Sequence, residues 1–343
     1  MASAPDRTGP RAPRIRDVAA RAGVGVGTVS RVLNDAPGVA DATRERVRAV
    51  MEELGYRPSS TARNLSLGRT QTLGVVAPFF TSPSVVERLR GIDDVIGDSA
   101  YDLTLFNIET LEQRHAALRR FARRTRIDGV IVISLPLAAA EARAMARDGL
   151  PAVLIDAANS ELPHVAIDDV EGGAIATRHL LDAGHRQIAF VGDVKDIEFG
   201  FASSERRLEG FQAALGDAGV PLPPGYVKRG PFGRASASRL ASQLLALRRR
   251  PTAIFAASDV QAFGVLDAAA RAGLAVPEDL SVIGFDDIEL ASAIGLTTVR
   301  QPLRESGQAG ARLLLSALDG GAAEAAELPG LAVVKRRTVG LPR

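Results

Sequence analysis

Polar side chains stand at the ends of apolar runs in the second part of the sequence. They are five carboxylates, one amide and two hydroxyls: Asn107, Ser134, Asp156, Asp193, Ser258, Asp259, Asp286 and Asp287. In an open parallel sheet, small ligands bind outside the carboxyl ends of the strands. The pattern therefore predicts a polar site for a small ligand, although a single Asp at a strand end can also be a helix N-cap or a surface charge.

Apolar runs of strand length alternate with helical patterns from Leu73 onward. The expected strands lie at 73–79, 101–108, 128–134, 151–156, 187–193, 253–258 and 280–286. The expected helices lie at 87–99, 111–125, 138–147, 171–183, 204–218, 235–249 and 260–272. Strands buried on both faces with helices between them predict doubly wound parallel sheets. Because 73–155 and 188–285 repeat the pattern, we expect two similar lobes.

Residues 14–34, RIRDVAARAGVGVGTVSRVLN, have the pattern of a helix-turn-helix. Apolar residues recur at helical spacing on either side of a glycine-containing break at 23–25: Ile15, Val18, Ala19 and Ala22, then Val29, Val32 and Leu33. In this motif the second helix enters the major groove of DNA and the first crosses the backbone. A third helix is expected at about 41–54, with Asp41 at its start as a cap or dipole partner and Gly55 after its end.

A short segment after Pro58 could form two helical turns from Thr61 to Leu67. So short a helix needs a partner, such as a dimer mate or a DNA groove. Leu65, between Arg63 and Arg69, suits a wedge that enters the minor groove and kinks a base step. The alternative is an ordinary linker that happens to contain a leucine.

The net charge of +2 is unevenly distributed along the 343 residues. Residues 1–69 contain 12 basic and 7 acidic side chains, whereas the remainder contains 30 and 33. A basic head on an acidic body favours a nucleic-acid partner for the head, although a solvated basic face is the alternative. The absence of cysteine excludes disulfides and thiolate metal sites. The sequence contains neither an apolar signal region nor a run of about 18 apolar residues, so we expect a cytoplasmic protein.

The chain resembles the lactose-repressor (LacI/GalR) family of bacterial transcription regulators. The resemblance rests on IRDVAARAGV, GTVSRVLN, TRERVRAVMEELGYRPS, ARNL and GRTQTLGVV, and in the body on VAIDDVEGGAIATRHLLDAGHRQIAFVG, RRLEGFQAAL, AIFAASDVQAFGVLDAAARAGLAVPEDLSVIGFDD and LTTVRQP. It extends from Arg14 to about Leu341. It implies an N-terminal all-α helix-turn-helix headpiece, followed by an α/β body of the type I periplasmic-binding-protein fold. That body consists of two Rossmann-like lobes that close on a small ligand.

The resemblance implies DNA-contact roles by position. Thr28, Ser30 and Asn34 match phosphate-positioning residues, and Val26, Gly27 and Arg31 match positions that face base edges. The further candidates are Arg16, Ser59, Ala62, Arg63 and Leu65, of which Leu65 matches the intercalating leucine of the family and Ala62 the small residue where paired hinge helices approach. Gly25 replaces a serine that is usual in the family, and Gly27 has no side chain to read a base. We therefore expect sparse direct readout, with Arg31 as the best guanine-binding candidate, and an operator choice that depends more on Leu65 and DNA deformability.

The resemblance also implies effector contacts. In the second lobe these are Arg207, the ligand-gripping arginine three residues before Gly210, with Ser258, Asp259 and Asp286; Gln301 lies at a crossover. A carboxylate and a guanidinium together can bind adjacent sugar hydroxyls. Asp259 could instead cap the helix expected from Val260. The first-lobe candidates are Phe79, Ser84, Asn107, Ser134 and Asp156.

The first lobe departs from the family pattern. Ser84 and Val85 replace two aromatic residues, and Ala157 stands where an arginine is common, so Phe79 or Phe80 would have to supply an aromatic platform. The ligand therefore need not be a simple hexose. We expect His185 to be structural, because it ends a helix far from the carboxyl edge.

The expected organisation has four parts: a disordered tail at 1–13, a helix-turn-helix domain at 14–58, a hinge helix and linker at 59–70, and an effector-binding and dimerisation domain at 71–341. The first lobe would comprise about 71–165 and 297–327, and the second about 166–296 and 328–341. Because no leucine-heptad tail follows the last strand, a dimer is expected.

The favoured function is a homodimeric regulator that binds a pseudo-palindromic DNA operator, most simply a repressor of carbohydrate-use genes that a small sugar relieves. An effector such as a nucleoside or purine is the alternative, and whether the ligand induces or corepresses stays open. A solute-binding protein would need a signal peptide and would give the basic head no purpose. An enzyme is disfavoured, because no GxGxxG follows a strand and the four histidines form no metal cluster. We expect no cofactor, no metal and no membrane association.

Overall fold

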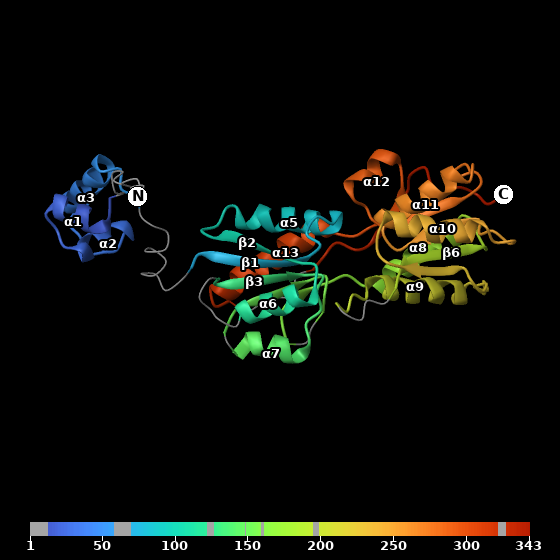
Figure 1. Cartoon of the computed structure of the whole chain (residues 1–343), viewed down its shortest axis with the longest axis horizontal. Coiled ribbons are helices and arrows are strands. Elements are labelled where there is room, and N and C mark those ends of the chain that lie inside the picture. Colours follow the sequence, from blue (N-terminus) through green and yellow to red (C-terminus); the bar gives the residue numbers. More distant parts are fainter. Residues whose placement is uncertain are drawn as a thin grey trace, which may run out of the picture. The chain divides into compact units, whose positions relative to one another are not determined.

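The computed structural model describes residues 13–57, 70–121, 127–147, 149–158, 161–194, 199–321 and 327–343. The chain divides into two units, Met1–Gln71 and Thr72–Arg343 (Figure 1). The predicted hinge contacts, Ser59, Ala62, Arg63 and Leu65, lie outside the described residues, as do residues 1–12 of the predicted tail. Among the described residues, no helix combines the length and apolar character needed to cross a bilayer.

The first unit contains three short helices: α1 (Ile15–Ala22), α2 (Val26–Leu33) and α3 (Asp41–Glu53). Val18, Val29 and Val47, one from each helix, form the centre of its core. The turn between α1 and α2 depends on Gly23, whose φ of 65° is in the left-handed region that glycine adopts without strain. The helix-turn-helix predicted from the sequence is confirmed.

Backbone groups, rather than side chains, cap the N-termini of the second and third helices. The carbonyl of Gly25 accepts hydrogen bonds from the amides of Thr28 and Val29 at 2.9 and 3.2 Å, so glycine caps α2 without a hydroxyl. Ala40 is the N-cap of α3, and Asp41 is its first residue. Asp41 therefore acts on the helix dipole rather than as a cap.

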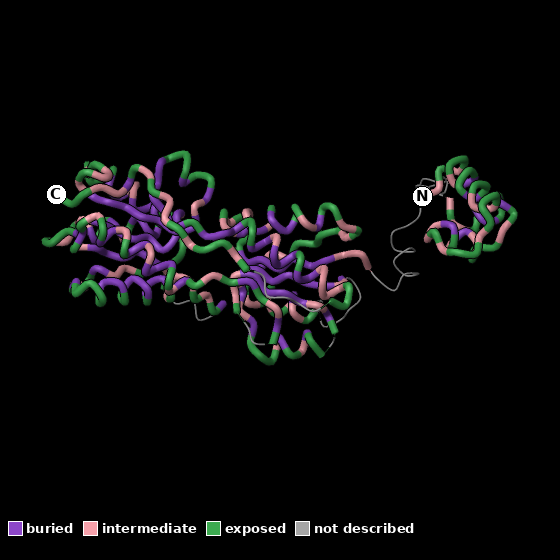
Figure 2. Tube along the Cα trace, turned by 180° about the vertical axis from the view of Figure 1, so that it is seen from behind, coloured by how far each residue is buried: buried purple, intermediate pink, exposed green. Residues whose placement is uncertain are grey.

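The first lobe of the second unit contains a five-stranded parallel sheet in the order β2-β1-β3-β4-β5. Its strands are β1 (Thr72–Pro78), β2 (Asp102–Ile108), β3 (Gly129–Ile133), β4 (Ala152–Ile155) and β5 (His164–Val165). The helices of this lobe are α5 (Pro83–Ile96), α6 (Leu111–Phe121), α7 (Ala139–Arg147) and α13 (Leu303–Leu318). Hydrophobic clusters lie on both faces of the sheet, and the buried strands lie inside the helices (Figure 2).

The second lobe contains a six-stranded sheet in the order β11-β10-β9-β8-β6-β7, in which only β11 is antiparallel. Its strands are β6 (Ile188–Asp193), β7 (Val227–Gly230), β8 (Ala253–Ala256), β9 (Ser281–Asp286), β10 (Thr297–Arg300) and β11 (Ala332–Val334). Its helices are α8 (Asp169–Asp182), α9 (Ser203–Asp217), α10 (Arg234–Leu245), α11 (Asp259–Arg271) and α12 (Glu289–Ile294). The predicted fold class, with two lobes of parallel sheet and covering helices, is confirmed.

Two details differ from the sequence prediction. Strand β2 was expected to be buried on both faces, but it is an edge strand, and Leu103 and Leu105 are 37% and 41% exposed. Residues 297–300 were expected in the first lobe, but they form β10 in the second sheet, where β9 satisfies their backbone groups. The chain returns to the first lobe only with α13, which packs against α5 and β4.

Glycines allow two pairs of helices to approach closely. A Cβ at Gly91 of α5 would lie 2.0 Å from the carbonyl oxygen of Arg304 in α13, and one at Gly307 would lie 2.1 Å from that of Arg88. In the second lobe, a Cβ at Gly210 of α9 would lie 1.8 Å from the carbonyl oxygen of Val170 in α8. These contacts fix the depth of α5 and α9 and therefore the positions of the side chains they carry.

Candidate functional site

Backbone strain concentrates at the carboxyl ends of the strands. Residues with positive φ follow or end β1, β3, β4 and β9: Phe79 (46°), Ser134 (51°), Asp156 (61°), Asp286 (124°) and Asp287 (60°). Strained non-glycine residues cluster at functional sites, where the surrounding structure holds them in place. This edge of the two sheets is also where the sequence places its polar side chains.

Arg207 is the central cation of the second lobe. It is 6% exposed; its Nε donates to Asp169 Oδ1 at 2.8 Å and its Nη1 to the carbonyl of Ala257 at 2.6 Å. Its Nη1 lies 3.9 Å from Asp286 Oδ1, and its guanidinium lies 3.7 Å from the centre of the Phe285 ring. Two carboxylates, a carbonyl and an aromatic face thus hold the guanidinium in one orientation.

Gln301 connects the polar groups of the two lobes. Its Nε2 donates to Asp286 Oδ1 at 2.5 Å, and its Oε1 accepts from Arg88 Nη2 at 3.1 Å. Arg88 Nη2 also lies 3.0 Å from Asp156 Oδ1, and Ser134 Oγ donates to Asp156 Oδ2 at 2.6 Å. One continuous network therefore joins Ser134 and Asp156 of the first lobe to Arg207 of the second.

The structure brings five of the ten predicted effector residues into this network: Ser134, Asp156, Arg207, Asp286 and Gln301. It adds Arg88 and Asp169, which sequence reasoning missed. The available signal for Arg88 was its position three residues before Gly91, the spacing that separates Arg207 from Gly210. Asp169 follows directly on Asp168, which is the N-cap of α8.

The remaining predicted effector residues lie outside the network. Asn107 Oδ1 accepts from the amide of Phe80 at 3.2 Å, and Ser84 contributes only a backbone carbonyl, 3.4 Å from Arg88 Nη1. The exposed ring of Phe79 packs edge-on against Phe199 at 6.2 Å between centroids. Phe79 is therefore placed to offer an aromatic surface, whereas among the described residues no side-chain hydrogen bond joins Ser84 or Asn107 to the charged groups of the network.

Ser258 and Asp259 have roles within the second lobe. Ser258 is the N-cap of α11, so the cap considered for Asp259 belongs to its neighbour. Asp259 is fully buried; its Oδ1 accepts from Thr298 Oγ1 at 2.6 Å and its Oδ2 from the amide of Ile288 at 3.0 Å. Its carboxylate ties β10 and the segment after β9 to α11, which sets it apart from the residues that could meet a ligand.

Burial controls the acidity of the carboxylates. It raises the pKa of Asp286 to about 6 against the opposing effects of Arg207 and Gln301. It also raises the pKa of Asp193 to about 6, although Arg207 and a 2.6 Å hydrogen bond from Gln261 Nε2 oppose the shift. Burial likewise raises the pKa of Asp169, against the positive charge of Arg207. Burial thus makes these carboxyls weaker acids than a free aspartate, and Asp193 and Asp286 take up protons near pH 6.

Replacement of Asp193 by Asn should flatten the dependence of stability on pH. The folded protein protonates Asp193 near pH 6 and the unfolded chain near pH 4, so between these values the folded state binds more protons. Wild-type stability should therefore rise as pH falls from 7.5 to 5, and Asp193→Asn should lose that contribution. Thermal unfolding across this range measures it, with Asp217→Asn, an exposed site on α9, as control. Equal slopes for wild type and Asp193→Asn would contradict the prediction.

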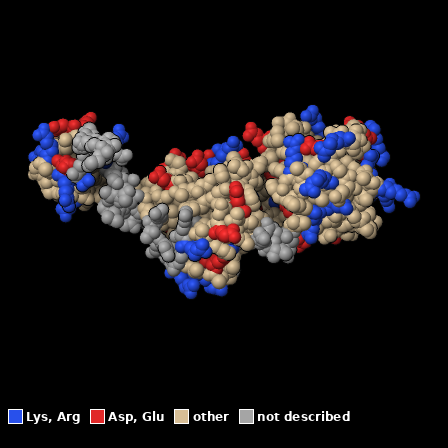
Figure 3. All heavy atoms as spheres, in the orientation of Figure 1, with Lys and Arg blue, Asp and Glu red and all other residues tan. Residues whose placement is uncertain are grey.

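The helix α2 presents the residues that the sequence assigns to DNA. Val29 and Val32 point into the core, while Val26, Gly27 and Arg31 are exposed and Thr28, Ser30 and Asn34 are half-buried. Val26, an apolar residue, is 42% exposed. Arg16 of α1 is exposed too, and basic side chains are spread over the visible face of this unit (Figure 3).

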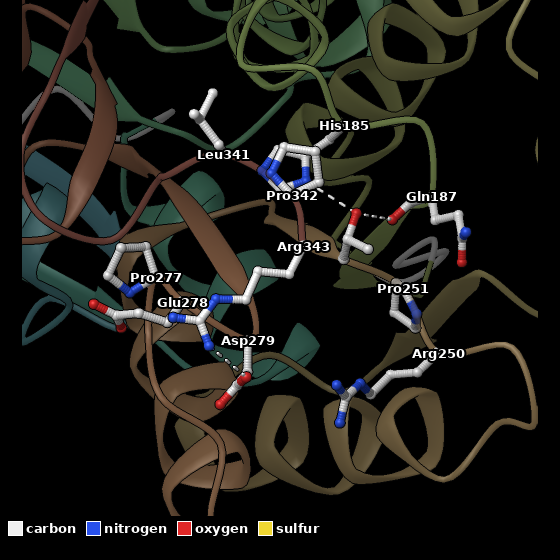
Figure 4. Close-up of a pocket in the computed structure, with 11 residues that line it drawn as sticks. His185, Gln187, Arg250, Pro251, Pro277, Glu278, Asp279, Leu341, Pro342 and Arg343 are labelled. Carbon is white, nitrogen blue, oxygen red and sulfur yellow. Dashed lines mark hydrogen bonds and ion pairs between the residues drawn. The ribbon is translucent and has the colours of Figure 1, made fainter.

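A cavity of about 370 Å³ lies at the opposite edge of the second sheet. It is formed by the segments before β6, β8 and β9 together with the last residues of the chain, and Arg343 reaches toward Asp279 across it (Figure 4). His185 borders it, buried, with ring nitrogens 2.9 Å from Thr252 Oγ1, Ser281 Oγ and the carbonyl of Gly340. Burial lowers the pKa of His185. These contacts agree with the structural role expected for His185.

Within the described part of the chain, no group of three or more His, Asp or Glu side chains is placed to hold a metal ion. The polar network has alternating donors and acceptors instead, an arrangement that suits an organic ligand with several oxygens.

Comparison with known proteins agrees with the two units. Residues 14–59 match the model for bacterial regulatory proteins of the lacI family, and residues 177–339 match a periplasmic binding protein-like domain. The HTH-type transcriptional repressor PurR of Photobacterium profundum is 35% identical over 307 residues, covering 88% of this chain and 90% of that protein. The ribose operon repressor of Escherichia coli is 36% identical, covering 86% of this chain and 89% of the relative.

A solved structure extends the likeness to the whole architecture. The Lac repressor dimer bound to operator and the anti-inducer ONPF matches with a TM-score of 0.83 and 28% identity, covering 96% of this chain and 100% of that one. The helix-turn-helix, the two-lobed body and these matches lead to one conclusion: the chain is a transcription regulator and belongs to the lacI family of bacterial regulatory proteins.

Proposed function

We propose that this protein is a homodimeric repressor that binds pseudo-palindromic operator DNA and that a small, uncharged carbohydrate changes its DNA affinity. The observation that carries the proposal is the polar network of the body, in which Gln301 connects the strand-end groups of both lobes. The same polypeptide carries helix α2, to which the sequence assigns DNA contacts. A ligand that meets this network acts on both lobes at once. It can change DNA binding only if it binds one lobe arrangement more tightly than another.

Two copies of α2, one from each protomer, would enter successive major-groove half-sites about one helical turn apart. The exposed Arg31 is the side chain on this helix that can bind guanine with two hydrogen bonds. Gly27, which is exposed as well, offers no side chain. Recognition would therefore depend on few base contacts, with phosphate contacts from Thr28, Ser30 and Asn34 and with DNA deformation supplying the rest.

The variant Arg31→Ala should lose about tenfold to hundredfold in operator affinity, because one bidentate base contact contributes about 1–3 kcal/mol. Binding to random duplex should weaken far less. The matched control is Arg46→Ala, which removes the same charge from an exposed position on α3. Fluorescence anisotropy on a selected operator and on random DNA provides both values. An equal loss on both duplexes for Arg31→Ala would mean that this residue reads no base.

The charge of the network indicates the class of effector. Three of its carboxylates (Asp156, Asp169 and Asp286) accompany two guanidiniums (Arg88 and Arg207), and a fourth carboxylate outside the hydrogen-bonded network, Asp193, also interacts electrostatically with Arg207. Both guanidiniums already bind protein carboxylates, so a phosphate or carboxylate on the ligand would meet uncompensated negative charge. Hydroxyl groups can donate to these carboxylates and accept from the guanidiniums. An uncharged polyol therefore fits better than a sugar phosphate or a sugar acid.

The decisive experiment joins ligand screening to DNA binding. Thermal unfolding of the full chain is measured with ribose, xylose, arabinose, glucose, galactose, mannose, cellobiose and maltose, then with their phosphorylated congeners and with purines and nucleosides. Each stabilising compound is next tested for its effect on operator affinity by anisotropy. An uncharged sugar that stabilises the body and shifts operator affinity supports the proposal, and the sign of the shift separates induction from corepression. A response confined to phosphorylated sugars or purines would overturn the assignment of the effector, and indifference to every compound would overturn ligand control.

The proposed function includes no catalytic step and no cofactor, in keeping with relatives that are named as repressors. Operator binding also requires the compartment that contains the chromosome, so the proposal implies a cytoplasmic protein.

A further inference from the structure

The two lobes repeat one another element by element. In the first, β1, α5, β2, α6, β3, α7 and β4 follow in order, and in the second β6, α9, β7, α10, β8, α11 and β9 do the same. The sheets repeat as well, since the order β2-β1-β3-β4 corresponds to β7-β6-β8-β9. Helix α5 therefore occupies in the first lobe the place of α9 in the second, and the end of β4 occupies the place of the end of β9.

The equivalent helices carry the same short motif. Residues 88–91 read Arg-Leu-Arg-Gly and residues 207–210 read Arg-Leu-Glu-Gly. Each motif packs in the same way, because Gly91 and Gly210 lie against carbonyl oxygens of the partner helix. Conversely, a Cβ at Gly307 would lie 2.1 Å from the carbonyl oxygen of Arg88, and a Cβ at Gly173 would lie 2.1 Å from that of Arg207. Arg88 is thus the structural counterpart of Arg207.

The two arginines also have equivalent acidic partners. Arg88 lies 3.0 Å from Asp156, which follows β4, and Arg207 lies 3.9 Å from Asp286, which ends β9. Both arginines are deeply buried, at 2% and 6% exposure. Gln301 binds Arg88 of one pair and Asp286 of the other. The network therefore consists of two matched guanidinium–carboxylate pairs, one from each lobe, with a shared amide between them.

Arg88 has a hydrogen-bond donor that no described residue of the protein accepts. Its Nε is buried and has no hydrogen-bond acceptor among the described residues, and its Nη1 reaches the carbonyl of Ser84 only at 3.4 Å. A buried donor without an acceptor costs about 1–3 kcal/mol, so each such group needs an explanation, and a ligand that supplies the acceptor is one. The side chain with this unsatisfied donor is the same one that joins Asp156 to Gln301.

We propose that Arg88 is a second effector-binding arginine, which holds from the first lobe the edge of the ligand opposite to the edge that Arg207 holds from the second. The inference rests on the proposed function and deepens it. The ligand then carries two separate sets of adjacent hydroxyls, one for each guanidinium–carboxylate pair. A sugar ring or a disaccharide has this property, whereas a ligand with polar groups on one edge only would satisfy one lobe.

The test is calorimetric titration of full-length variants with the sugar of the panel that binds wild type most tightly. Arg88→Met should weaken binding at least about tenfold, as expected for the loss of a hydrogen bond from a charged donor. Arg88→Lys, which keeps the charge near Asp156 but loses the planar fork, should give an intermediate loss and guards against a folding defect of Arg88→Met. Arg90→Met, an exposed position on the same helix, should bind within about twofold of wild type.

Deoxy congeners of the same sugar distinguish a direct contact between Arg88 and the ligand from an indirect role in positioning other residues. Removal of the hydroxyl that Arg88 holds should weaken binding to wild type about tenfold and to Arg88→Met hardly at all, whereas removal of a hydroxyl held by Arg207 should weaken binding to both. If the removal of each hydroxyl lowers the binding affinity of wild type and of Arg88→Met by the same factor, Arg88 does not touch the ligand and the inference fails. Wild type that binds no sugar contradicts the proposed effector class, and wild type that binds a sugar unaffected by either Arg88 variant contradicts this inference alone.

Discussion

The variant Gly210→Ala should lower the free energy of unfolding of the body by about 3 kcal/mol, the upper part of the range for an overpacked interior. The added methyl group would lie 1.8 Å from the carbonyl oxygen of Val170 and 2.8 Å from the amide nitrogen of Ala174, both in the backbone of α8. Neither atom can turn away as a side chain could, so α9 must move off α8. Because α9 carries Arg207, the same movement should also weaken binding of the effector. Urea unfolding of the full chain and calorimetric titration measure the two effects.

A second glycine on the same helix provides the control. Gly216 lies further along α9, and a Cβ there would meet nothing within 4 Å. Its replacement by Ala should stabilise the body by about 0.5–1 kcal/mol, because alanine loses less backbone entropy in a helix. If Gly210→Ala and Gly216→Ala have the same effect, the close approach of α8 and α9 does not limit stability.

The strands and helices that carry the site could be predicted because their signals are local. Runs such as IAFVGD and SVIGFD are apolar over a strand length and end in a carboxylate, so both the strand and its polar end are visible in the sequence. That rule found Asp156 and Asp286. It also selected Asp259, whose partners Thr298 and Ile288 lie 39 and 29 residues away and are invisible to any local pattern.

Arg88 could not be found by the same means. It lies inside a helix with several charged residues, Glu87, Arg90, Asp93 and Asp94, where a further arginine resembles a solvated surface charge. Only the packing of α5 against α13 and the contact with Asp156, which follows β4, show that this position is buried and faces a carboxylate. Internal comparison of the lobes could have identified it, because the Arg-Leu-x-Gly motif occurs at equivalent places in both.

The position of a strand at the edge of a sheet could not be predicted for a related reason. The segment DLTLFNI has the length and four of the apolar residues expected of a buried strand, yet β2 has a strand partner on one side only and exposes Leu103 and Leu105. Strand order is set by the crossovers of the whole sheet, which hydrophobicity along the chain does not encode. The same holds for β10, whose short sequence gives no indication that it pairs with β9 rather than with a strand of the first lobe.

The variant Arg207→Met should have the largest effect on the body at neutral pH. It removes the cation from the buried carboxylates of Asp169 and Asp286, and breaking such a pair costs about 3–5 kcal/mol. The loss should depend on pH, because burial already raises the pKa of both carboxyls and Arg207 opposes that rise. Without Arg207 the folded state holds these protons to still higher pH than the unfolded chain does. Stability of the variant should therefore fall as pH rises, and its deficit relative to wild type should be larger at pH 7.5 than at pH 5.

Arg206→Met is the matched control for this variant, because Arg206 precedes Arg207 on α9 but has a half-exposed side chain 3.7 Å from Asp168. A surface pair of this kind contributes about 0–1 kcal/mol, so its loss should change stability little at either pH. Urea unfolding of wild type, Arg206→Met and Arg207→Met at pH 5 and 7.5 gives the six values required. A deficit of Arg207→Met that does not change with pH would show that Asp169 and Asp286 do not depend on this guanidinium for their charge. The shared network of the two lobes would then depend for its charge on the buried pair of Arg88 and Asp156 rather than on Arg207.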